Sequence, residues 1–366
     1  MTDQPWTVGR SKWDLDTPSL MVDLDVLDRN VARMATTFKQ AGVGWRPHTK
    51  GIKVPALAHK LLRAGAFGIT CAKLGEAEVM AAAGVGDILI ANQVVGGPKI
   101  ARLVNLIPWA DVIVAVDDES NVGELERAAA DKGVRPRIVV EVNTGMNRAG
   151  VEPGQATVAL ARCVDACEHL RFVGVMGWEG HSVTVGDAAE KRAIVQRAVG
   201  QLVDSAERCR DAGLPVAIVS CGGTGDYATA SGIPGVTEVQ AGGGIFCDVH
   251  YREHMHVDHE YASTVLATVT SRPTATRIIC DTGKKTMSTD AAAPKPLIDG
   301  TVQALSFSAE HARIDVAEPS ALRVGDKIEF VVGYTDTTTM LHDELFGVRD
   351  GRVETVWPIL GRGKLR

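Results

Sequence analysis

The sequence lacks an excess of basic charge, a long hydrophobic run and an N-terminal secretion signal. Its formal net charge is −6 at pH 7, and this acidic balance argues against nucleic acid or an anionic membrane as the main partner. No apolar run approaches the roughly 18 residues that a membrane-spanning helix needs. Residues 1–6 do not begin a basic segment followed by an apolar one. We therefore expect no signal peptide, no membrane association and no nucleic-acid partner.

Cysteine pairs and a dinucleotide-binding fingerprint are also missing. The seven cysteines are odd in number and scattered, and none belongs to a C-x-x-C motif. This pattern predicts reduced thiols in a cytoplasmic protein rather than a disulfide framework. No G-x-G-x-x-G follows the first expected strand, which argues against a doubly wound nucleotide-binding fold.

Short apolar segments alternate with helical patterns through the first two thirds of the chain. Continuous apolar strands in repeated βα units predict a parallel sheet with both faces covered. About eight such units in succession favour a closed (β/α)8 barrel of the TIM type over an open sheet. The expected strands are residues 19–23, 44–46, 68–70, 88–91, 112–116, 138–142, 172–177, 216–220 and 238–242.

The pattern changes near residue 250. The later segments are short, alternating and β-rich, and Asp350-Gly351 is a hairpin signal between two of them. We assign residues 15–250 to the barrel, and residues 1–14 and 251–366 to an all-β domain. The expected strands of that domain are residues 263–271, 276–281, 301–308, 312–316, 327–332, 345–349 and 352–357.

The most unusual stretch is WRPHTKGIK at residues 45–53, which follows an expected strand and precedes a helical pattern. Lys50 lies there between apolar segments, with Arg46, His48 and Lys53 as neighbours. Burial and nearby positive charge lower the pKa of an amine and make it nucleophilic, as Schiff-base chemistry with an aldehyde cofactor requires. The alternative is a basic turn that binds a phosphate or nothing.

Further polar residues follow other expected strands, where a barrel of this kind builds its site. Arg148 offers a fork of donors to a cofactor's phenolic oxygen or a substrate carboxylate. His181 is a candidate acid or base, with a purely structural histidine as the alternative. The segments SCGGTG at 220–225 and QAGGG at 240–244 carry backbone N–H groups that suit a phosphate.

Taken together, these motifs resemble a known family. RPHTK at 46–50, GITCAKLGEAE at 68–78, MNR at 146–148 and DTGKKTMSTD at 281–290 resemble the D-threonine aldolase / D-serine dehydratase-like family. That family includes 3-hydroxy-D-aspartate aldolases, and the resemblance covers nearly the whole chain. It implies the pyridoxal-phosphate barrel and C-terminal β-domain that alanine racemases have, the fold of type III pyridoxal-phosphate enzymes.

The resemblance also implies residue roles. Lys50 would carry pyridoxal 5′-phosphate, His48 would lie beside it, and Arg148 would face the pyridine ring. A homodimer acting on a D-amino acid is expected. The remaining cofactor-binding residues would come from the two glycine-rich segments: Ser220, Gly222, Gly223, Thr224, Gln240, Gly242 and Gly243.

One position departs from the family pattern. Characterised members carry a His-x-Asp or His-x-Cys pair that holds a divalent metal near the substrate's β-hydroxyl, whereas this chain has Tyr334-x-Asp336. A phenol, with an ordinary pKa near about 10, is a poor ligand for Mn or Mg at neutral pH. Three outcomes stay open: the metal (Mn, Mg or Zn) is lost, Asp336 holds it together with Glu310 or His311, or Tyr334 replaces it as an acid or base.

The tyrosine favours an aldolase, which would cleave a D-3-hydroxy amino acid to glycine and an aldehyde. A dehydratase needs more Lewis-acid help, because hydroxide is a poor leaving group. His181, Tyr334 or a metal-bound hydroxide on Asp336 would take the proton of the β-hydroxyl. The alternatives are a D-serine or 3-hydroxy-D-aspartate dehydratase, a racemase that uses Tyr334, and a non-catalytic pyridoxal-phosphate carrier. The histidines between residues 250 and 259 are expected to form a solvated or interface cluster.

Overall fold

The structure, a computed structural model, describes residues 7–366 and divides into two compact units. The β unit comprises the described residues up to Val31 together with Gly243–Arg362. The barrel unit comprises Ala32–Gly242 and Gly363–Arg366. The boundaries expected from the sequence are 14/15 and 250/251, and residues 1–6 of the expected first segment lie outside the described residues.

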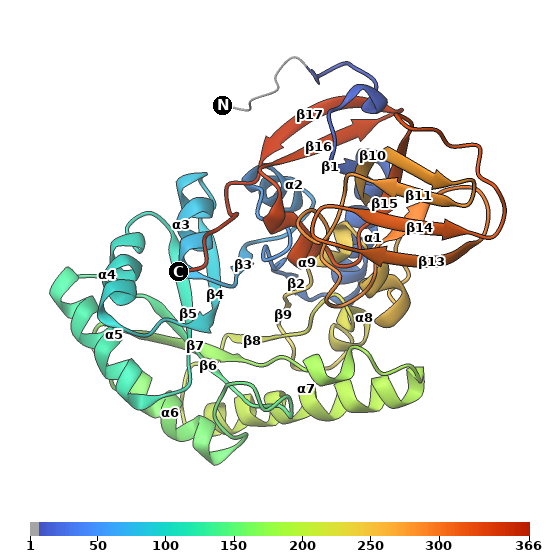
Figure 1. The fold of residues 1–366 in the computed structure, drawn as a ribbon. Helices are drawn as coiled ribbons and strands as arrows, with labels where there is room; N and C mark the ends of the chain where they lie inside the picture. The colour runs from blue at the N-terminus through green and yellow to red at the C-terminus, as the bar shows by residue number, and fades with distance from the viewer. Residues whose placement is uncertain (1–6) are drawn as a thin grey trace. The chain divides into compact units, whose positions relative to one another are not determined.

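Eight parallel strands form the sheet of the barrel unit, in the order β2-β9-β8-β7-β6-β5-β4-β3 (Figure 1). A parallel bridge between His48 and Thr70 joins the two ends of this order, so the sheet closes on itself. The predicted (β/α)8 barrel is therefore confirmed. The strands are β2 (Gly44–Trp45), β3 (Ile69–Cys71), β4 (Asp87–Gln93), β5 (Asp111–Val116), β6 (Arg137–Glu141), β7 (Arg171–Met176), β8 (Ile218–Cys221) and β9 (Glu238–Val239).

Helices alternate with these strands, and Figure 1 shows α4 to α7 along the outside of the sheet. Local signals set their ends: Asp118 caps α5 by accepting from the backbone N–H groups of Ser120 and Asn121, and Gly133 ends it in the left-handed conformation. The helices are α1 (Leu24–Ala41), α2 (Pro55–Arg63), α3 (Leu74–Ala82), α4 (Gly97–Leu106), α5 (Glu119–Lys132), α6 (Gln155–Asp165), α7 (Ala188–Asp211) and α8 (Tyr227–Ala230).

The β unit is built on a nine-stranded sheet whose main path is β13-β14-β11-β10-β1-β16-β17. Asp350 and Gly351 have φ of +48° and +72°, as a type I′ hairpin turn between β16 and β17 requires, so the hairpin prediction is confirmed. The strands after β1 are β10 (Ser263–Thr274), β11 (Arg277–Cys280), β12 (Lys295–Leu297), β13 (Val302–Phe307), β14 (Ala312–Val316), β15 (Lys327–Val331), β16 (Glu344–Arg349) and β17 (Arg352–Pro358).

One strand belongs to a different sheet from the one expected. Ser19–Asp23, expected to open the barrel, is β1 of the β unit, antiparallel to β10 and parallel to β16. Its first four residues are buried. A continuous apolar run has the same pattern whether it enters a barrel or the middle of another sheet, so the pattern alone could not assign it.

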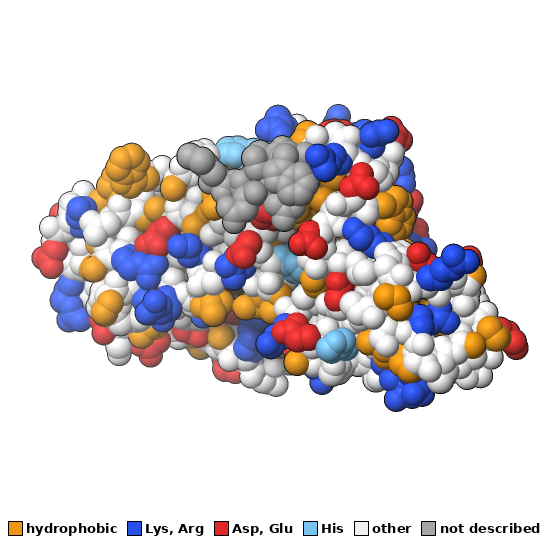
Figure 2. Space-filling view, turned by 45° about the horizontal axis from the view of Figure 1, so that its top comes forward, with side chains coloured by type: hydrophobic (Ala, Val, Ile, Leu, Met, Phe, Trp, Pro, Cys, Tyr) orange, Lys and Arg blue, Asp and Glu red, His pale blue; other side chains and the backbone are white. Residues whose placement is uncertain are grey.

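The surface and the thiols agree with the composition. On the face drawn in Figure 2, basic and acidic side chains are interspersed rather than gathered into a patch of one sign. All seven cysteines are free thiols. Among residues 7–366, no helix has both the length and the apolar character that crossing a bilayer requires.

Candidate active site

Two cations predicted from separate strand ends meet at one aromatic ring. The Nζ atom of Lys50 lies 5.5 Å from the ring centroid of Trp178, and the guanidinium carbon of Arg148 lies 4.9 Å from it. The ring's electron-rich face attracts both side chains. Lys50 is half-buried and Arg148 is exposed. The chain after β2, the loop after β6 and the chain after β7 therefore converge, as expected at the carboxyl end of a barrel.

The two glycine-rich segments lie at the same end of the barrel. Ser220 at the end of β8 accepts a hydrogen bond on Oγ from Nε2 of Gln240 at 3.0 Å, and both residues are buried. A Cβ on Gly242 would lie 2.1 Å from the backbone oxygen of His48, and one on Gly223 would lie 3.1 Å from Nε1 of Trp178. Only glycine allows the approach at Gly242, and the contact at Gly223 is tight, so both segments are packed closely against the lysine-bearing and tryptophan-bearing loops.

A buried carboxyl pair, Glu179 and Asp226, lies beneath the first glycine-rich segment. The N–H of Gly223 donates to Asp226 Oδ1 at 2.7 Å, and that of Gly222 donates to Glu179 Oε2 at 3.4 Å. These two amides, expected to point at a phosphate, therefore hold the loop in place. The other oxygens of the pair, Glu179 Oε1 and Asp226 Oδ2, are buried and accept from no N–H group, and the two carboxyl side chains interact with each other.

Burial governs the protonation of this pair. It raises the pKa of Asp226 to about 6. Burial, together with the charge of Asp226, raises the pKa of Glu179 well above its ordinary range. Two carboxylates this close cannot both ionise at little cost, so the pair retains a proton under mildly acidic conditions.

Glu141, the last residue of β6, is a third buried carboxyl group at this end. It accepts a hydrogen bond from Nε2 of Gln93 at 2.6 Å, and Nη2 of Arg148 lies 3.7 Å from its other oxygen. Burial raises the pKa of Glu141. Sequence reasoning missed Glu141, Glu179 and Asp226. A single acidic residue closing an apolar strand, as in RIVVE, was the available signal for Glu141.

His181 lies in a short helical turn after β7 and is exposed. Its ring packs against the loop that carries Arg148, because a Cβ on Gly145 would lie 3.2 Å from His181 Cε1. The structure thus places His181 beside the Arg148 loop. The predicted cations Lys50 and Arg148 lie over Trp178, three residues before His181, and not over His181 itself.

Two neighbours of Lys50 do not play the part expected of them. Arg46 is buried and hydrogen-bonded to both oxygens of Glu238, at 2.9 and 3.2 Å, and also pairs with Asp87. Lys53 is buried in an ion pair with Glu76. The expectation that both add positive charge around Lys50 is therefore wrong, because a buried cation is normally neutralised by a carboxylate.

Tyr334 and Asp336 lie in the β unit, at the start of α9 (Thr335–Thr338). The phenol of Tyr334 donates to Asp336 Oδ2 at 2.9 Å. Burial, and next the charge of Asp336, raise the pKa of this phenol far above its ordinary value. Of the proposed helpers for a metal, Glu310 instead forms an ion pair with Lys285 at 2.8 Å. Within residues 7–366, no three His, Cys, Asp or Glu side chains are grouped to hold a metal ion.

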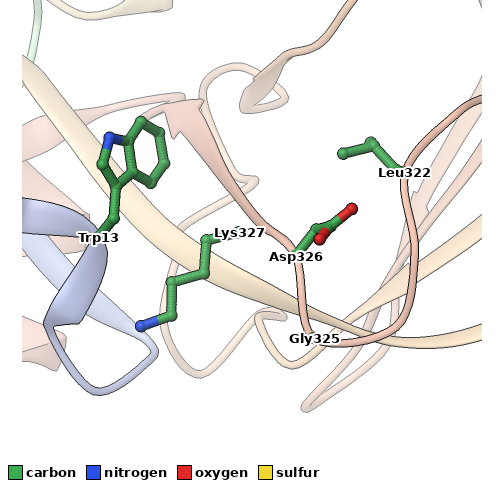
Figure 3. Close-up of a pocket in the computed structure, with 5 residues that line it drawn as sticks. All are labelled: Trp13, Leu322, Gly325, Asp326 and Lys327. Carbon is green, nitrogen blue, oxygen red and sulfur yellow. The ribbon is translucent and has the colours of Figure 1, made fainter.

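A cavity of about 420 Å³ lies elsewhere in the β unit. Figure 3 shows its lining, in which Trp13 and Lys327 project from neighbouring segments. The ammonium group of Lys327 is used inside the fold, because it donates to the backbone oxygen of Leu15. None of the residues predicted for the active site lines this cavity.

Comparisons with known proteins identify the family to which the chain belongs. Residues 22–249 match the family model "Alanine racemase, N-terminal domain", and residues 262–348 match "Putative serine dehydratase domain". The 3-hydroxy-D-aspartate aldolase of Paracoccus denitrificans (strain Pd 1222) is 33% identical over 99% of this chain and 96% of its own length. The D-threonine aldolase of Arthrobacter sp is 35% identical over 95% of this chain and 93% of its own length. The chain belongs to the D-threonine aldolase family.

Solved structures support the same family. The D-threonine aldolase of Filomicrobium marinum superposes with a TM-score of 0.95 at 35% identity, covering 98% of this chain and 99% of that one. The D-threo-3-hydroxyaspartate dehydratase of Delftia sp. HT23 gives a TM-score of 0.86 at 28% identity, covering 96% and 99%. The protein is therefore an enzyme of a lyase family that contains both aldolases and dehydratases.

The D-threonine aldolase family implies pyridoxal phosphate, and the residues present fit that group. Lys50 supplies an amine and Arg148 a second cation, both over the indole of Trp178. Gly223 and Gly242 keep the adjoining backbone free of side chains where a Cβ would collide with Trp178 or His48. A primary amine, a nearby cation and tightly packed glycine segments suit an aldehyde-bearing aromatic phosphate.

Proposed function

We propose that the protein is a pyridoxal-phosphate-dependent aldolase that cleaves D-3-hydroxy amino acids, of the D-threonine type, to glycine and an aldehyde. The observation that carries the proposal is the meeting of Lys50 and Arg148 over Trp178, beside the glycine-rich segment that ends β8. Full-length similarity to proteins named as aldolases supports the reaction class.

Each residue has a role that its position allows. Lys50 would hold the cofactor's aldehyde carbon, Arg148 would face the ring, and His48 would line the same side of the barrel mouth. The phosphate would be held by Ser220, Thr224, Gln240, Gly242 and Gly243, whereas the amides of Gly222 and Gly223 are used by Glu179 and Asp226. Bound in this way, the cofactor supplies an electron sink for the charge that develops at the substrate's Cα.

Proton handling falls to the chain's own side chains. His181 is exposed at the end of β7 and can exchange protons with water, so we assign it the proton of the substrate's β-hydroxyl. Tyr334 remains a candidate proton donor. Its environment favours retention of the proton, since burial and Asp336 raise its pKa.

The first experiment maps the cofactor attachment. Borohydride reduction of the purified holoenzyme, followed by peptide mapping, should place the reduced adduct on Lys50. Lys50→Ala should abolish the adduct, the visible cofactor absorbance and all turnover, whereas Lys99→Ala, a change at an exposed lysine of α4, should leave them unchanged. An adduct on any other lysine would refute the assignment.

The second experiment fixes the reaction. D-threonine, D-phenylserine, D-3-hydroxyaspartate and D-serine are supplied in turn, and glycine and ammonia are measured separately. We expect glycine with an aldehyde. Ammonia without glycine would identify a dehydratase. The similarity to the Delftia dehydratase is the reason for testing this alternative. Deuterium incorporation and inversion of D-alanine in heavy water would identify a racemase, and a cofactor spectrum with no turnover would identify a carrier.

The cellular setting and assembly complete the proposal. The seven free thiols support a reducing compartment, and we propose the cytoplasm. We also propose a homodimer, which light scattering of the purified protein would test. A monomer at assay concentrations, active at its full rate, would exclude it.

A further inference from the structure

Asp336 is held by two phenols, and we call Tyr251, Tyr334 and Asp336 the phenol–carboxylate cluster. Tyr334 donates to Oδ2 at 2.9 Å, and the hydroxyl of Tyr251 donates to Oδ1 at 3.3 Å. The two rings lie with centroids 5.7 Å apart and planes inclined by 60°. Each carboxylate oxygen of Asp336 therefore accepts from a different tyrosine.

A second carboxyl group fixes the two tyrosines in place. Asp248, which is fully buried, accepts from the backbone N–H of Tyr251 at 2.8 Å and from that of Thr335 at 2.6 Å. It thereby ties the short π-helix His250–His254 to the residue after Tyr334. Tyr251 is buried as well. The hydroxyl groups are consequently held against Asp336 by the fold rather than by chance rotamers.

The ring of His250 packs against the phenol–carboxylate cluster. The nearest ring to Tyr334 is that of His250, with centroids 5.0 Å apart and planes inclined by 75°, an edge-on packing contact. Residues 7–366 contain no grouping of three His, Cys, Asp or Glu side chains suited to a metal. An un-ionised phenol donates its hydrogen and is a poor ligand for Mn²⁺ or Mg²⁺, which prefer carboxylate, carbonyl and water oxygens.

We propose that Tyr334 bars a divalent metal from Asp336, and that the internal hydrogen bonds of the phenol–carboxylate cluster occupy the place where the family's His-x-Asp or His-x-Cys pair would hold an ion. The inference rests on the proposed function, because that function makes this position the expected metal site. Tyr251, absent from any sequence motif considered above, is a positioning residue for Asp336. The reaction then needs no divalent ion at this carboxylate.

The test measures metal binding without substrate. The chelator-treated holoenzyme is titrated with Mn²⁺, and binding is followed by calorimetry and by the electron paramagnetic resonance of free Mn²⁺. We expect no stoichiometric site in the wild type, in Tyr334→Phe or in Tyr251→Phe. Tyr334→His should gain one Mn²⁺ per chain, and Tyr251→Phe/Tyr334→His should bind it about tenfold or more tightly, because both oxygens of Asp336 are then released.

Matched controls keep the result specific. Tyr261→Phe removes the other phenol–carboxylate hydrogen bond of the β unit, from Tyr261 to Glu253 at 2.6 Å, and should create no site. Tyr334→His/Asp336→Asn should lose the ion that Tyr334→His gains. The cofactor spectrum and a thermal melt verify that each variant is folded.

Two outcomes would overturn the proposal. One is stoichiometric Mn²⁺ binding by the wild type that Asp336→Asn abolishes, a measurement that depends on no tyrosine variant. The other is a folded Tyr334→His protein that still binds no Mn²⁺, since the tyrosine would then not be what excludes the ion. Neither result depends on glycine release, so failure of this inference and failure of the aldolase assignment are distinguishable.

Discussion

The two ends of the barrel bury charged side chains in opposite ways. At the amino end, two arginines, Arg46 and Arg137 of β6, meet acidic residues that begin strands: Asp87 of β4, Asp111 of β5 and Glu238 of β9. Arg137 bridges Asp87 at 2.9 Å and Asp111 at 2.7 Å, while Arg46 bridges Asp87 and Glu238. Positive and negative groups alternate, and every carboxylate has a guanidinium.

At the carboxyl end, acids lie together instead. Glu179 and Asp226 are both buried and face each other, and burial raises the pKa of both. Burial raises the pKa of Glu141 there as well. The cations at this end, Lys50 and Arg148, lie over the Trp178 ring and remain partly open to solvent.

The charged groups at the amino end stabilise the fold, whereas those at the carboxyl end serve the function. The paired charges at the amino end join β4, β5, β6 and β9 to Arg46, the residue that follows β2. The buried acid pair at the carboxyl end raises the free energy of the folded chain when both groups are ionised. Such strain persists in proteins where a ligand or a reaction uses it. This contrast matches the division of labour known for barrels of this kind, with stability at one face and chemistry at the other.

Replacing Arg46, which pairs with two carboxylates at the amino end, should have the largest effect on the free energy of unfolding. Arg46→Met leaves the buried carboxylate of Glu238 without its cation, and we expect a loss of about 3–5 kcal/mol of unfolding free energy, measured by urea denaturation. Arg29→Met, which breaks the exposed Arg29–Glu260 pair, should cost less than about 1 kcal/mol. Equal losses in the two variants would mean that the buried network is not stabilising.

Relieving the acid pair at the other end should stabilise the protein, but only at higher pH. Burial, and next the charge of Asp226, raise the pKa of Glu179 well above its ordinary range on folding, so the penalty for ionising Glu179 is absent at pH values below that range and grows as pH rises above it. Glu179→Gln removes the opposing acid and keeps an oxygen that can accept from Gly222. We expect a gain of about 1–3 kcal/mol in unfolding free energy at pH 8 and little change near pH 4.

Urea titrations at three pH values would measure this gain. Glu168→Gln, at an exposed position, serves as the control and should show no pH-dependent difference. A Glu179→Gln protein that is less stable than the wild type at pH 8 would show that the pair stabilises the loop instead of straining it.

Replacing Trp178 should have the smallest effect of the three changes. Trp178→Leu removes the face that Lys50 and Arg148 share, and cation–π contacts of about 0.5–1 kcal/mol each predict a fall in kcat/KM for glycine release of about 5- to 30-fold. Trp178→Phe keeps an aromatic face and should recover most of the loss. Trp109→Leu, a change at a side chain that is 80% exposed, should leave kcat/KM unaltered. No loss in Trp178→Leu would show that the ring does not position the two cations.

Much of this architecture is readable from sequence, because strands and helices depend on local periodicity. The repeated βα pattern led to the barrel, and the Asp-Gly turn to a hairpin with the expected backbone angles. The position of Lys50 beyond a strand and the glycines after the last two strands likewise follow from the order of elements along the chain.

What sequence missed depends on contacts between distant residues. Nothing local distinguishes Ser19–Asp23 in a barrel from the same strand between β10 and β16. Arg46 appeared to be a neighbour of Lys50, although its partner Glu238 begins the last barrel strand. The pairing of Glu179 with Asp226, and of Tyr251 with Asp336, joins segments whose meeting only the folded chain reveals.

The placement of β1 affects how the protein can be made and taken apart. Because β1 is flanked by β10 and β16, the β unit is assembled from two stretches of chain with the whole barrel inserted between them. During translation, β1 cannot pair with β10 or β16 until the barrel residues have been synthesised. The barrel residues Ala32–Gly242 form one continuous stretch, whereas the β unit is made of two, and the first boundary between the units lies inside α1.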